Sequence, residues 1–435
     1  MSMSTAFSLK GSEFKTNWPL LILIALMPLR NIQLQYIPNL GGGLNFINVF
    51  FLLALGHAMM YGKKLDTKPP INKFLVWYII TSIIALFFGY SFLGSASAGL
   101  WKALKDSLIP VFLVFVIQKS AIDDVQWRRI FVATLIPLPY CFKVVWNQYK
   151  SVASQHYTHD LRISGTFMDL GANEMGAFSV MMALVSLGCL ISCWQHKKWR
   201  YIFAACFLFG AMSLLFSYSR GGYISFLLGA IIIIMKFKHR KKLIFPLLLA
   251  ISIGLMNLPK SVEERFNSID AEEEERDESA QSRFVFWAIA FDKFLERPVF
   301  GYGYHTAQDK RINPHEMDTH NYYVKMLVER GLVGFVTFLV LLRIFWNLAK
   351  RNIRRENNDQ LQYGLILGML GAIPALTLGN MFGDRFSHYP ISTALWVFIA
   401  LISIIEVRRI KEEKEASNND AQDGTHYQQG QWRQT

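Results

Sequence analysis

Residues 171–193 read GANEMGAFSVMMALVSLGCLISC, and this stretch decides the kind of fold to expect. Glu174 is its one charged residue. A helix that crosses a bilayer needs roughly 20 mostly apolar residues, because the hydrocarbon layer is about 30 Å thick. The stretch therefore predicts a transmembrane helix.

Similar runs recur along the whole chain of 435 residues, of which 52% are hydrophobic and only 18% are charged. They lie at 18–37, 44–61, 73–91, 98–118, 128–149, 171–193, 199–217, 221–237, 241–257, 320–347, 361–382 and 390–407. The first is the weakest, because Pro28 and Arg30 interrupt it early. The sequence thus predicts an all-α, polytopic integral membrane protein with about 12 transmembrane helices.

Cations in the short loops predict how the chain is oriented, since cytoplasmic loops carry an excess of Lys and Arg. One set of alternate loops holds most of them: Lys63, Lys64, Lys68, Lys73, Lys119, Arg128, Arg129, Lys197, Lys198, Arg200, Lys236, Lys238, Arg240, Lys241, Lys242, Arg351, Arg354, Arg355, Arg408 and Arg409. We expect these loops and both termini to be cytoplasmic, as an even number of spans requires.

The net charge of +13 is mostly this topological signal, so we expect no nucleic acid partner. Residues 1–18 are polar and precede the first apolar run without a cleavage site, which argues against a cleaved signal peptide. Cys141, Cys189, Cys193 and Cys206 fall in or beside apolar segments. We expect them to be buried small side chains, and neither disulfides nor metal ligands.

Two longer loops lie on the outer side, at roughly 150–171 and 258–319. The second divides the chain: transmembrane helices 1–9 occupy residues 1–257, the large periplasmic loop 258–319, and helices 10–12 residues 320–409. The remaining 410–435 is rich in Asn, Gln and Asp and is expected to be a disordered cytoplasmic tail.

Within the large loop, the acidic run 272–278 is typical of a solvated, mobile segment. Residues 282–291 then have apolar side chains at helical spacing, with Ser282 as the expected N-cap. Arg297-Pro298 ends this helix, and Gly301-Tyr302-Gly303 forms a turn. We expect an amphipathic helix lying along the membrane surface.

Several cations occur on the outer side, where topology does not favour them. They are Lys102, Lys105, Lys143, Arg162, Arg220, Arg283 and Arg385. Each alone is compatible with a side chain that reaches out to the interface. Together they predict a cationic cleft for an anionic, lipid-borne ligand, because guanidinium groups bind phosphate oxygens through a bidentate fork.

His320 lies in Asp318-Thr319-His320-Asn321-Tyr322-Tyr323, where the long loop re-enters the membrane. An imidazole has an ordinary pKa of about 6.5, which suits proton transfer near neutrality; a structural role is the alternative. We find no metal-ligating set around His305, His315 or His320, and no phosphate-binding glycine loop. The sequence therefore predicts no metal and no other cofactor.

The ordered motifs resemble those of the O-antigen ligase and O-antigen polymerase superfamily of bacterial membrane glycosyltransferases. They are Ser219-Arg220-Gly221, Arg283 with Trp287, Pro298 with Gly301 and Gly303, His320-Asn321-Tyr322-Tyr323, and Glu329 with Gly331 and Gly334. Arg162 through Asn173 resembles an earlier loop of that family more weakly.

The resemblance implies a GT-C-type helical fold in the bacterial inner membrane, with the active site facing the periplasm. It implies metal-independent transfer of a glycan from undecaprenyl diphosphate to an acceptor hydroxyl. Carried onto this chain, Arg220 and Arg283 bind the donor pyrophosphate, and His320 accepts the acceptor proton or positions the acceptor. We expect further substrate contacts from Arg162, Lys102, Lys105, Lys143, Tyr322 and Arg385.

The acceptor stays open. Lipid A core would make the protein an O-antigen ligase, and a second lipid-linked glycan would make it an O-antigen or exopolysaccharide polymerase; protein O-glycosylation is a third possibility. Two other classes remain: a transporter of lipid-linked glycan, which needs a site reachable from both sides, and a non-enzymatic scaffold.

Overall fold

A computed structural model describes residues 14–37, 41, 45–121, 123–152, 162–237, 273–314, 319–353 and 359–431, and the side chains of 273–284 and 416–431 are not described. Every regular element in this part of the chain is a helix. The helices are α1 (Trp18–Leu26), α2 (Arg30–Tyr36), α3 (Phe46–Tyr61), α4 (Ile71–Leu93), the 3-10 turn η2 (Gly94–Ser97), α5 (Leu100–Ser120), α6 (Asp124–Leu135), α7 (Leu138–Val152), α8 (Ala172–Ser192), α9 (Lys197–Phe216), α10 (Arg220–Lys236), α13 (Glu273–Glu296), α14 (Tyr322–Asn352), α15 (Gln360–Gly379) and α16 (Tyr389–Gln431).

Seven helical segments in this part of the chain are long and apolar enough to cross a membrane. They are α4 with η2, α6 with α7, α8, α9, α14, α15, and α16 as far as Glu415. This confirms an all-helical, multi-spanning membrane protein. The seven segments among the described residues do not reach the predicted count of about 12 transmembrane helices.

Four predicted spans form helices that are shorter or more charged. The run 18–37 is broken at Met27–Leu29 into α1 and α2, because the ring of Pro28 interrupts the helix. The run 44–61 gives α3 with 16 residues, and 221–237 gives α10 with 17. α5 covers 98–118 but carries Lys102, Lys105 and Asp106 in its first turns. The run 241–257 lies outside the described residues.

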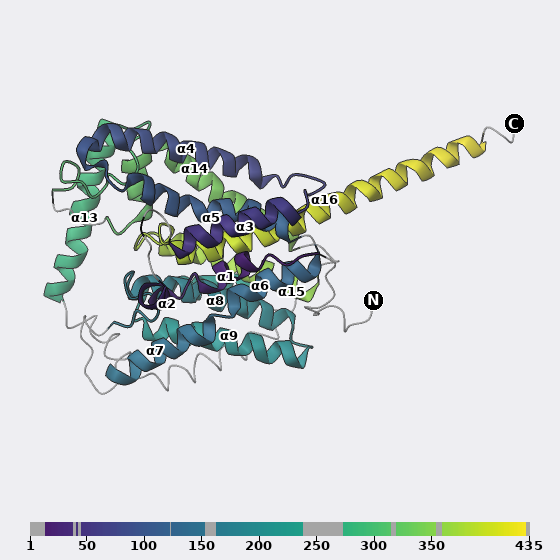
Figure 1. Cartoon of the computed structure of the whole chain (residues 1–435), viewed down its shortest axis with the longest axis horizontal. Coiled ribbons are helices and arrows are strands. Elements are labelled where there is room, and N and C mark those ends of the chain that lie inside the picture. The colour runs from purple at the N-terminus through teal and green to yellow at the C-terminus, as the bar shows by residue number, and fades with distance from the viewer. Residues whose placement is uncertain are drawn as a thin grey trace.

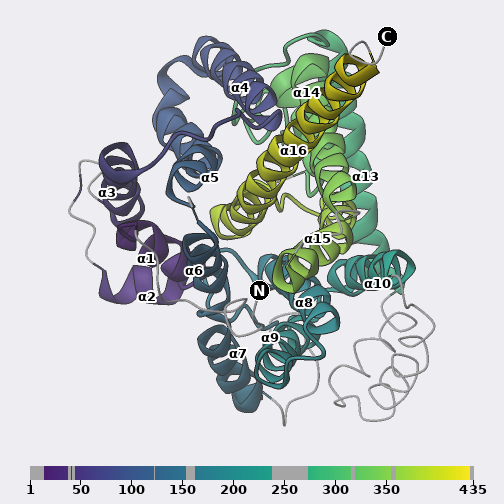
Figure 2. The same cartoon turned by 90° about the vertical axis from the view of Figure 1, so that its right-hand side faces the viewer.

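The helices lie roughly side by side, and α13 crosses one end of the bundle (Figure 1). Seen along the bundle, α16 runs through the middle with α5 and α14 beside it (Figure 2). The most buried candidate spans are α8, α15 and α16. α8 packs on α9, α10 and α15. Gly188 packs directly against the backbone of Gly364 and Gly368, the close approach that small residues allow between membrane helices. Cys141, Cys189, Cys193 and Cys206 are free and buried, as predicted.

The cation-rich loops meet at the end away from α13, which we term the cation-rich end. Arg128 pairs there with Asp359, Arg351 with Glu406, and Lys411 with Asp66. Both ends of the described chain lie here too: the Asn17 side chain donates to Ser120, and α16 extends outward from this end (Figure 1). The common end agrees with an even number of crossings.

Two segments are helical where the sequence suggests mobility. α13 begins at Glu273 and includes most of the acidic run, so Ser282 is not its N-cap. Glu and Ala are strong helix formers, and their propensity outweighs the charge repulsion in the run. α16 continues as a helix to Gln431, into the tail for which disorder is expected.

α13 is amphipathic, as predicted. Phe286, Ala290 and Phe294 are buried at spacings of four residues, whereas Phe291 and Leu295 are more than half exposed. This stripe packs the helix against α14 and leaves apolar side chains on the outside. A helix with such a face, lying across the end of a bundle, is suited to the plane of a membrane interface.

The turn after α13 is hydrogen-bonded to a break in α14. The amides of Tyr302 and Gly303 donate to the carbonyls of Val328 and Glu329, and those of Leu332 and Val333 donate to Pro298 and Val299. Gly331 has a φ of +57° inside α14 and approaches Val299 closely. The two glycine motifs of the sequence are therefore one structural joint.

We expect Gly303→Ala to destabilise this joint strongly. Gly303 has a φ of +113°, and a Cβ there would lie 1.9 Å from the amide nitrogen of Gly89 in α4. The left-handed strain alone costs about 1–2 kcal/mol, and the clash with backbone adds to it. The measurement is the thermal unfolding temperature in detergent.

Gly56→Ala is the matched control, because a Cβ at this helical glycine of α3 meets nothing within 4 Å. Alanine there is expected to leave the unfolding temperature unchanged or to raise it. Equal stability of the two variants would contradict the role assigned to the joint.

Candidate functional site

Arg220 is the first residue of α10. Ser219 caps this helix, its hydroxyl accepting from the amide of Gly222, and Tyr218 before it has a φ of +53°. After this sharp entry, Arg220 is half-buried in the first turn of α10. The next residue, Gly221, lies against the side chain of Phe382, which follows α15.

His320 immediately precedes the N-cap of α14. Its side chain is exposed and its φ is +48°. Asn321 caps α14 by accepting from the amides of Tyr323 and Val324, at 3.0 and 3.3 Å. The amide of Tyr322 donates to the carbonyl of Asn380 at 2.9 Å. The residues that closely follow Arg220 and His320, namely Gly221 and Tyr322, therefore contact the same turn of residues 380–382, which ends α15.

α13 is fastened to the same place. Trp287 donates its indole N–H to the carbonyl of Thr319 at 2.7 Å, so the middle of α13 lies against the residue before His320. Arg283 is one helical turn before Trp287 on the same helix. The structure describes its backbone and not its side chain, so it places the helix that carries Arg283 beside His320.

Arg162 and Arg385 lie at the start of α8. Arg162 donates to Asn173, and the buried Arg385 is paired with Glu174 and also donates to the carbonyl of Phe382. Asn173, Ser219, Gly221 and Arg385 line a common cavity of about 20 Å³. Arg162 and Arg385 thus both contact the first turn of α8, and the two neighbours of Arg220 in the sequence line the same small cavity as Arg385. We term these three residues the arginine cluster.

The other predicted contacts are more scattered. Lys102 and Lys143 are exposed, and neither lines a described cavity. Lys105 donates to Asn48 and pairs with Asp106. Tyr322 is buried, with its ring against Phe338 and Phe386. Lys102, Lys105 and Lys143 therefore do not line either of the described cavities, and the predicted cationic cleft would contain fewer residues than the sequence suggests.

Arg385→Ala is expected to lower the free energy of unfolding by roughly 3 kcal/mol, because it leaves the largely buried Glu174 with only His388, at 3.7 Å, as a partner. The double variant Glu174→Gln, Arg385→Gln removes both charges and is expected to recover most of that loss. Thermal unfolding in detergent measures both variants. A double variant as unstable as the single one would show that the pair is not the main role of Arg385.

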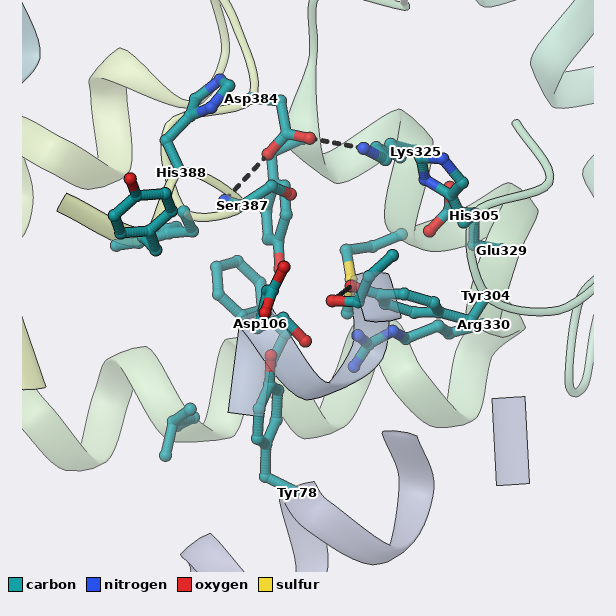
Figure 3. A pocket seen from close by; sticks show the side chains of 18 of the residues that line it. Tyr78, Asp106, Tyr304, His305, Lys325, Glu329, Arg330, Asp384, Ser387 and His388 are labelled. Atoms are coloured by element: carbon teal, nitrogen blue, oxygen red, sulfur yellow. Dashed lines mark hydrogen bonds and ion pairs between the residues drawn. The ribbon is translucent and has the colours of Figure 1, made fainter. Parts of the chain in front are cut away.

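A larger cavity of about 340 Å³ lies on the other side of the loop 383–389 (Figure 3). Its lining comes from α4, α5, α14, α16 and two loops: Tyr78, Asp106, Tyr304, His305, Lys325, Glu329, Arg330, Asp384, His388 and Trp396 are among the residues. Tyr322 lines it as well, two residues after His320. We term this space the central cavity.

The charges of the central cavity are largely matched. Lys325 pairs with Asp384 at 2.5 Å, as Figure 3 shows. Burial raises the pKa of the Asp384 carboxyl, but the charges of Lys325 and His388 outweigh it and hold the pKa below its ordinary value. Arg330 donates to Ser82 at 2.8 Å and lies over the rings of Tyr78 and Tyr304.

Sequence reasoning missed this cavity, although the sequence carries a signal for it. Glu329 and Arg330 are ionisable residues within the run 320–347, and such residues in a transmembrane segment suggest a functional site by default. Asp106 in the run 98–118 is a second case. Their convergence depends on the break at Gly331 and on the loop 383–389, which no spacing reveals.

Among the described residues, no group of three or more His, Cys, Asp or Glu side chains is placed to hold a metal ion. The metal-free reaction stays a prediction.

Part of the chain is similar to a known family and to two known proteins. Residues 204–339 match the family model described as O-antigen ligase. A protein of Haemophilus influenzae named "Uncharacterized protein" is 30% identical over 225 residues, which cover 45% of this chain and 55% of the relative. A "Putative polysaccharide ligase" of Rickettsia conorii is 23% identical over 141 residues, or 29% of this chain and 33% of the relative.

The chain thus spans about half of the first relative and a third of the second. The matched segment 204–339 runs from α9 into α14 and includes Arg220, Arg283 and His320. The chain is a polytopic membrane protein in which residues 204–339 are similar to the family described as O-antigen ligase.

Proposed function

We propose that this protein is a glycosyltransferase that moves an O-antigen-type glycan from undecaprenyl diphosphate to an acceptor hydroxyl, acting as an O-antigen ligase with lipid A core as acceptor. The observation that supports the proposal is that the neighbours of Arg220 and His320 contact the same turn: Gly221 lies against Phe382, and the amide of Tyr322 donates to the carbonyl of Asn380. Trp287 fastens the helix of Arg283 to the same point. All three candidate residues fall in the matched domain.

In the proposed reaction, the acceptor oxygen attacks the anomeric carbon of the donor sugar. The bond from that carbon to the pyrophosphate oxygen breaks, and undecaprenyl diphosphate leaves with the bonding electrons. Charge grows on the leaving oxygen, so the guanidinium groups of Arg220 and Arg283 stabilise the transition state more than the ground state. His320 takes the proton of the attacking hydroxyl.

The orientation belongs to the same proposal. Cations gather at the end that holds Arg128, Arg351 and Lys411, which we assign to the cytoplasm of a bacterial inner membrane. The α13 end, with the arginine cluster and His320, then faces the periplasm, and α13 lies in the headgroup region of the outer leaflet. No nucleic acid takes part.

The test is a reconstituted assay in EDTA with undecaprenyl-diphosphate-linked glycan, in which lipid A core and lipid-linked repeat units are offered separately. Product on lipid A core supports the ligase. A ladder on the lipid carrier would make the protein a polymerase instead. Folded protein and intact donor without product on either acceptor would count against transfer, and movement of intact donor across the membrane would then favour a transporter.

A further inference from the structure

The central cavity has no role in the reaction described so far. Its volume of about 340 Å³ falls in the range of small-molecule sites, roughly 300–1,000 Å³. It is separated from the arginine cluster by the loop 383–389, whose neighbours Asp384 and Arg385 turn to opposite sides: Asp384 pairs with Lys325, and Arg385 pairs with Glu174. The loop therefore lies between two chemically different spaces, and its His388 lines the cavity while coming within 3.7 Å of Glu174.

Glu329 is the residue that most strongly indicates a ligand in the central cavity. It is 3% exposed and lines the central cavity. Its carboxylate accepts no hydrogen bond and forms no ion pair among the described residues, although the charge of Arg330 lies nearby. A buried carboxylate is costly unless hydrogen bonds satisfy it. The cavity thus presents a strong hydrogen-bond acceptor that no described side chain engages.

The lining disfavours two ligand classes. Three carboxylates face the space; Asp106 pairs with Lys105 and Asp384 with Lys325, which leaves the charge of Glu329 to repel a phosphate group. The two cations do not compensate, since Lys325 pairs with Asp384 and Arg330 is held by Ser82 and two tyrosine rings. An acyl chain would pack against Phe338, Leu341 and Leu342 of the lining but would leave the charged groups unsolvated, so it fits the cavity less well than a ligand that carries hydrogen-bonding groups.

The lining suits a hydroxyl-rich ring. Carboxylates are acceptor-only groups and take hydrogen bonds from hydroxyls. The rings of Tyr304, Tyr322 and Trp396 provide apolar surface between them. A sugar has hydroxyls around its edge and C–H groups on its faces, so it satisfies both kinds of lining at once.

We propose that the central cavity binds a sugar residue of a glycan substrate, with Glu329 and Asp106 accepting hydrogen bonds from its hydroxyls. The inference rests on the proposed function, and it adds that the arginine cluster and the sugar site are separate, on either side of loop 383–389. Tyr322 connects them: it lines the cavity, and its chain position is two residues after His320. The sugar can come from the acceptor or from the donor.

Binding to the purified full-length protein in detergent tests this without any transfer step. The probes are two oligosaccharides without lipid or pyrophosphate: the acceptor core and the donor repeat unit. We expect one of them to bind. Glu329→Gln and Asp106→Asn should each weaken its binding about tenfold, because a charge-assisted hydrogen bond becomes a neutral one.

If Glu329→Gln does not fold, Asp106→Asn still tests the proposal. The Asp106 side chain is 35% exposed, so the position tolerates an amide. Glu413→Gln is the matched control. Glu413 is an exposed residue of α16 at the cation-rich end, hydrogen-bonded to Arg409, and its variant should bind as the wild type does. Inorganic pyrophosphate should not displace the oligosaccharide.

Absence of binding by both oligosaccharides, unchanged binding in both folded cavity variants, or displacement by pyrophosphate would overturn the sugar site. In the transfer assay, the variants should raise KM for the same glycan about tenfold and leave KM for the other one unchanged. Normal KM values in active variants would reject the cavity and keep the transferase. Oligosaccharide binding that depends on Glu329, without transfer to any acceptor, would keep the cavity and reject the transferase.

Discussion

Arg220→Ala is expected to leave the protein folded and to lower the rate of glycan transfer by about 10³-fold, as the loss of a catalytic arginine does in phosphoryl transfer. The reason is electrostatic: a guanidinium fixed at the start of α10 stabilises charge that develops only as the pyrophosphate leaves. The helix itself keeps its cap, because Ser219 still accepts from the amide of Gly222. Single-turnover transfer in the reconstituted assay measures the rate.

Two variants control this result. Arg220→Lys keeps the charge but loses the bidentate fork, so its rate should lie between those of wild type and Arg220→Ala. Arg200→Ala removes an arginine from the first turn of α9, where it stacks on Trp194 and Tyr201, and should leave the rate unchanged. A folded Arg220→Ala protein with wild-type activity would remove Arg220 from the site.

His320→Asn is expected to lower the transfer rate by about 10²–10⁴-fold, the usual contribution of a general base. Asparagine is the informative substitution, because His320 has a φ of +48° and Asn tolerates this left-handed region better than Ala does. The hydrogen bonds of Asn321 that cap α14 are unaffected. Stability should therefore stay near that of the wild type while the rate falls.

A rescue experiment separates a base from a positioning group. His320→Gly accepts the same backbone conformation and leaves space for added imidazole. Partial recovery of the rate with imidazole supports proton transfer at this position. A rate loss in His320→Asn that appears only as a raised KM for the acceptor would show that His320 positions the acceptor and does not take its proton.

Periodicity predicted the helices well, because apolar length is a direct consequence of membrane thickness. Its errors have local causes. Pro28 divides the first run, and the charges in α5 and the shortness of α3 and α10 keep these helices below the length and apolarity of a clear span. Ser282 was a reasonable N-cap by residue type, but the acidic residues before it extend α13 to Glu273.

Candidate site residues could be predicted where a charged side chain occurs in an apolar segment or on the outer side. Contacts that depend on how distant segments pack together could not be predicted. Arg162, Arg220 and Arg385 were expected to converge. Arg162 and Arg385 both contact the first turn of α8, and the convergence of all three side chains stays a prediction. Lys102 and Lys143 were expected with them and are exposed elsewhere, because position near a helix end does not say which way a side chain faces. The glycines at 301, 303 and 331 read as a family motif; their backbone angles and close contacts explain them as a joint.

The central claim is that Arg220 and His320, a hundred residues apart in the sequence, act in the same transfer step. Arg220 stabilises the leaving pyrophosphate, and His320 takes the proton of the attacking hydroxyl. The transfer rate of the double variant Arg220→Ala, His320→Asn tests it most directly, measured by single turnover beside both single variants. Groups that act as a unit are strongly non-additive, so the double variant should be within about tenfold of the slower single one. A loss equal to the product of the two single losses would mean that the two residues act independently, and would contradict the account.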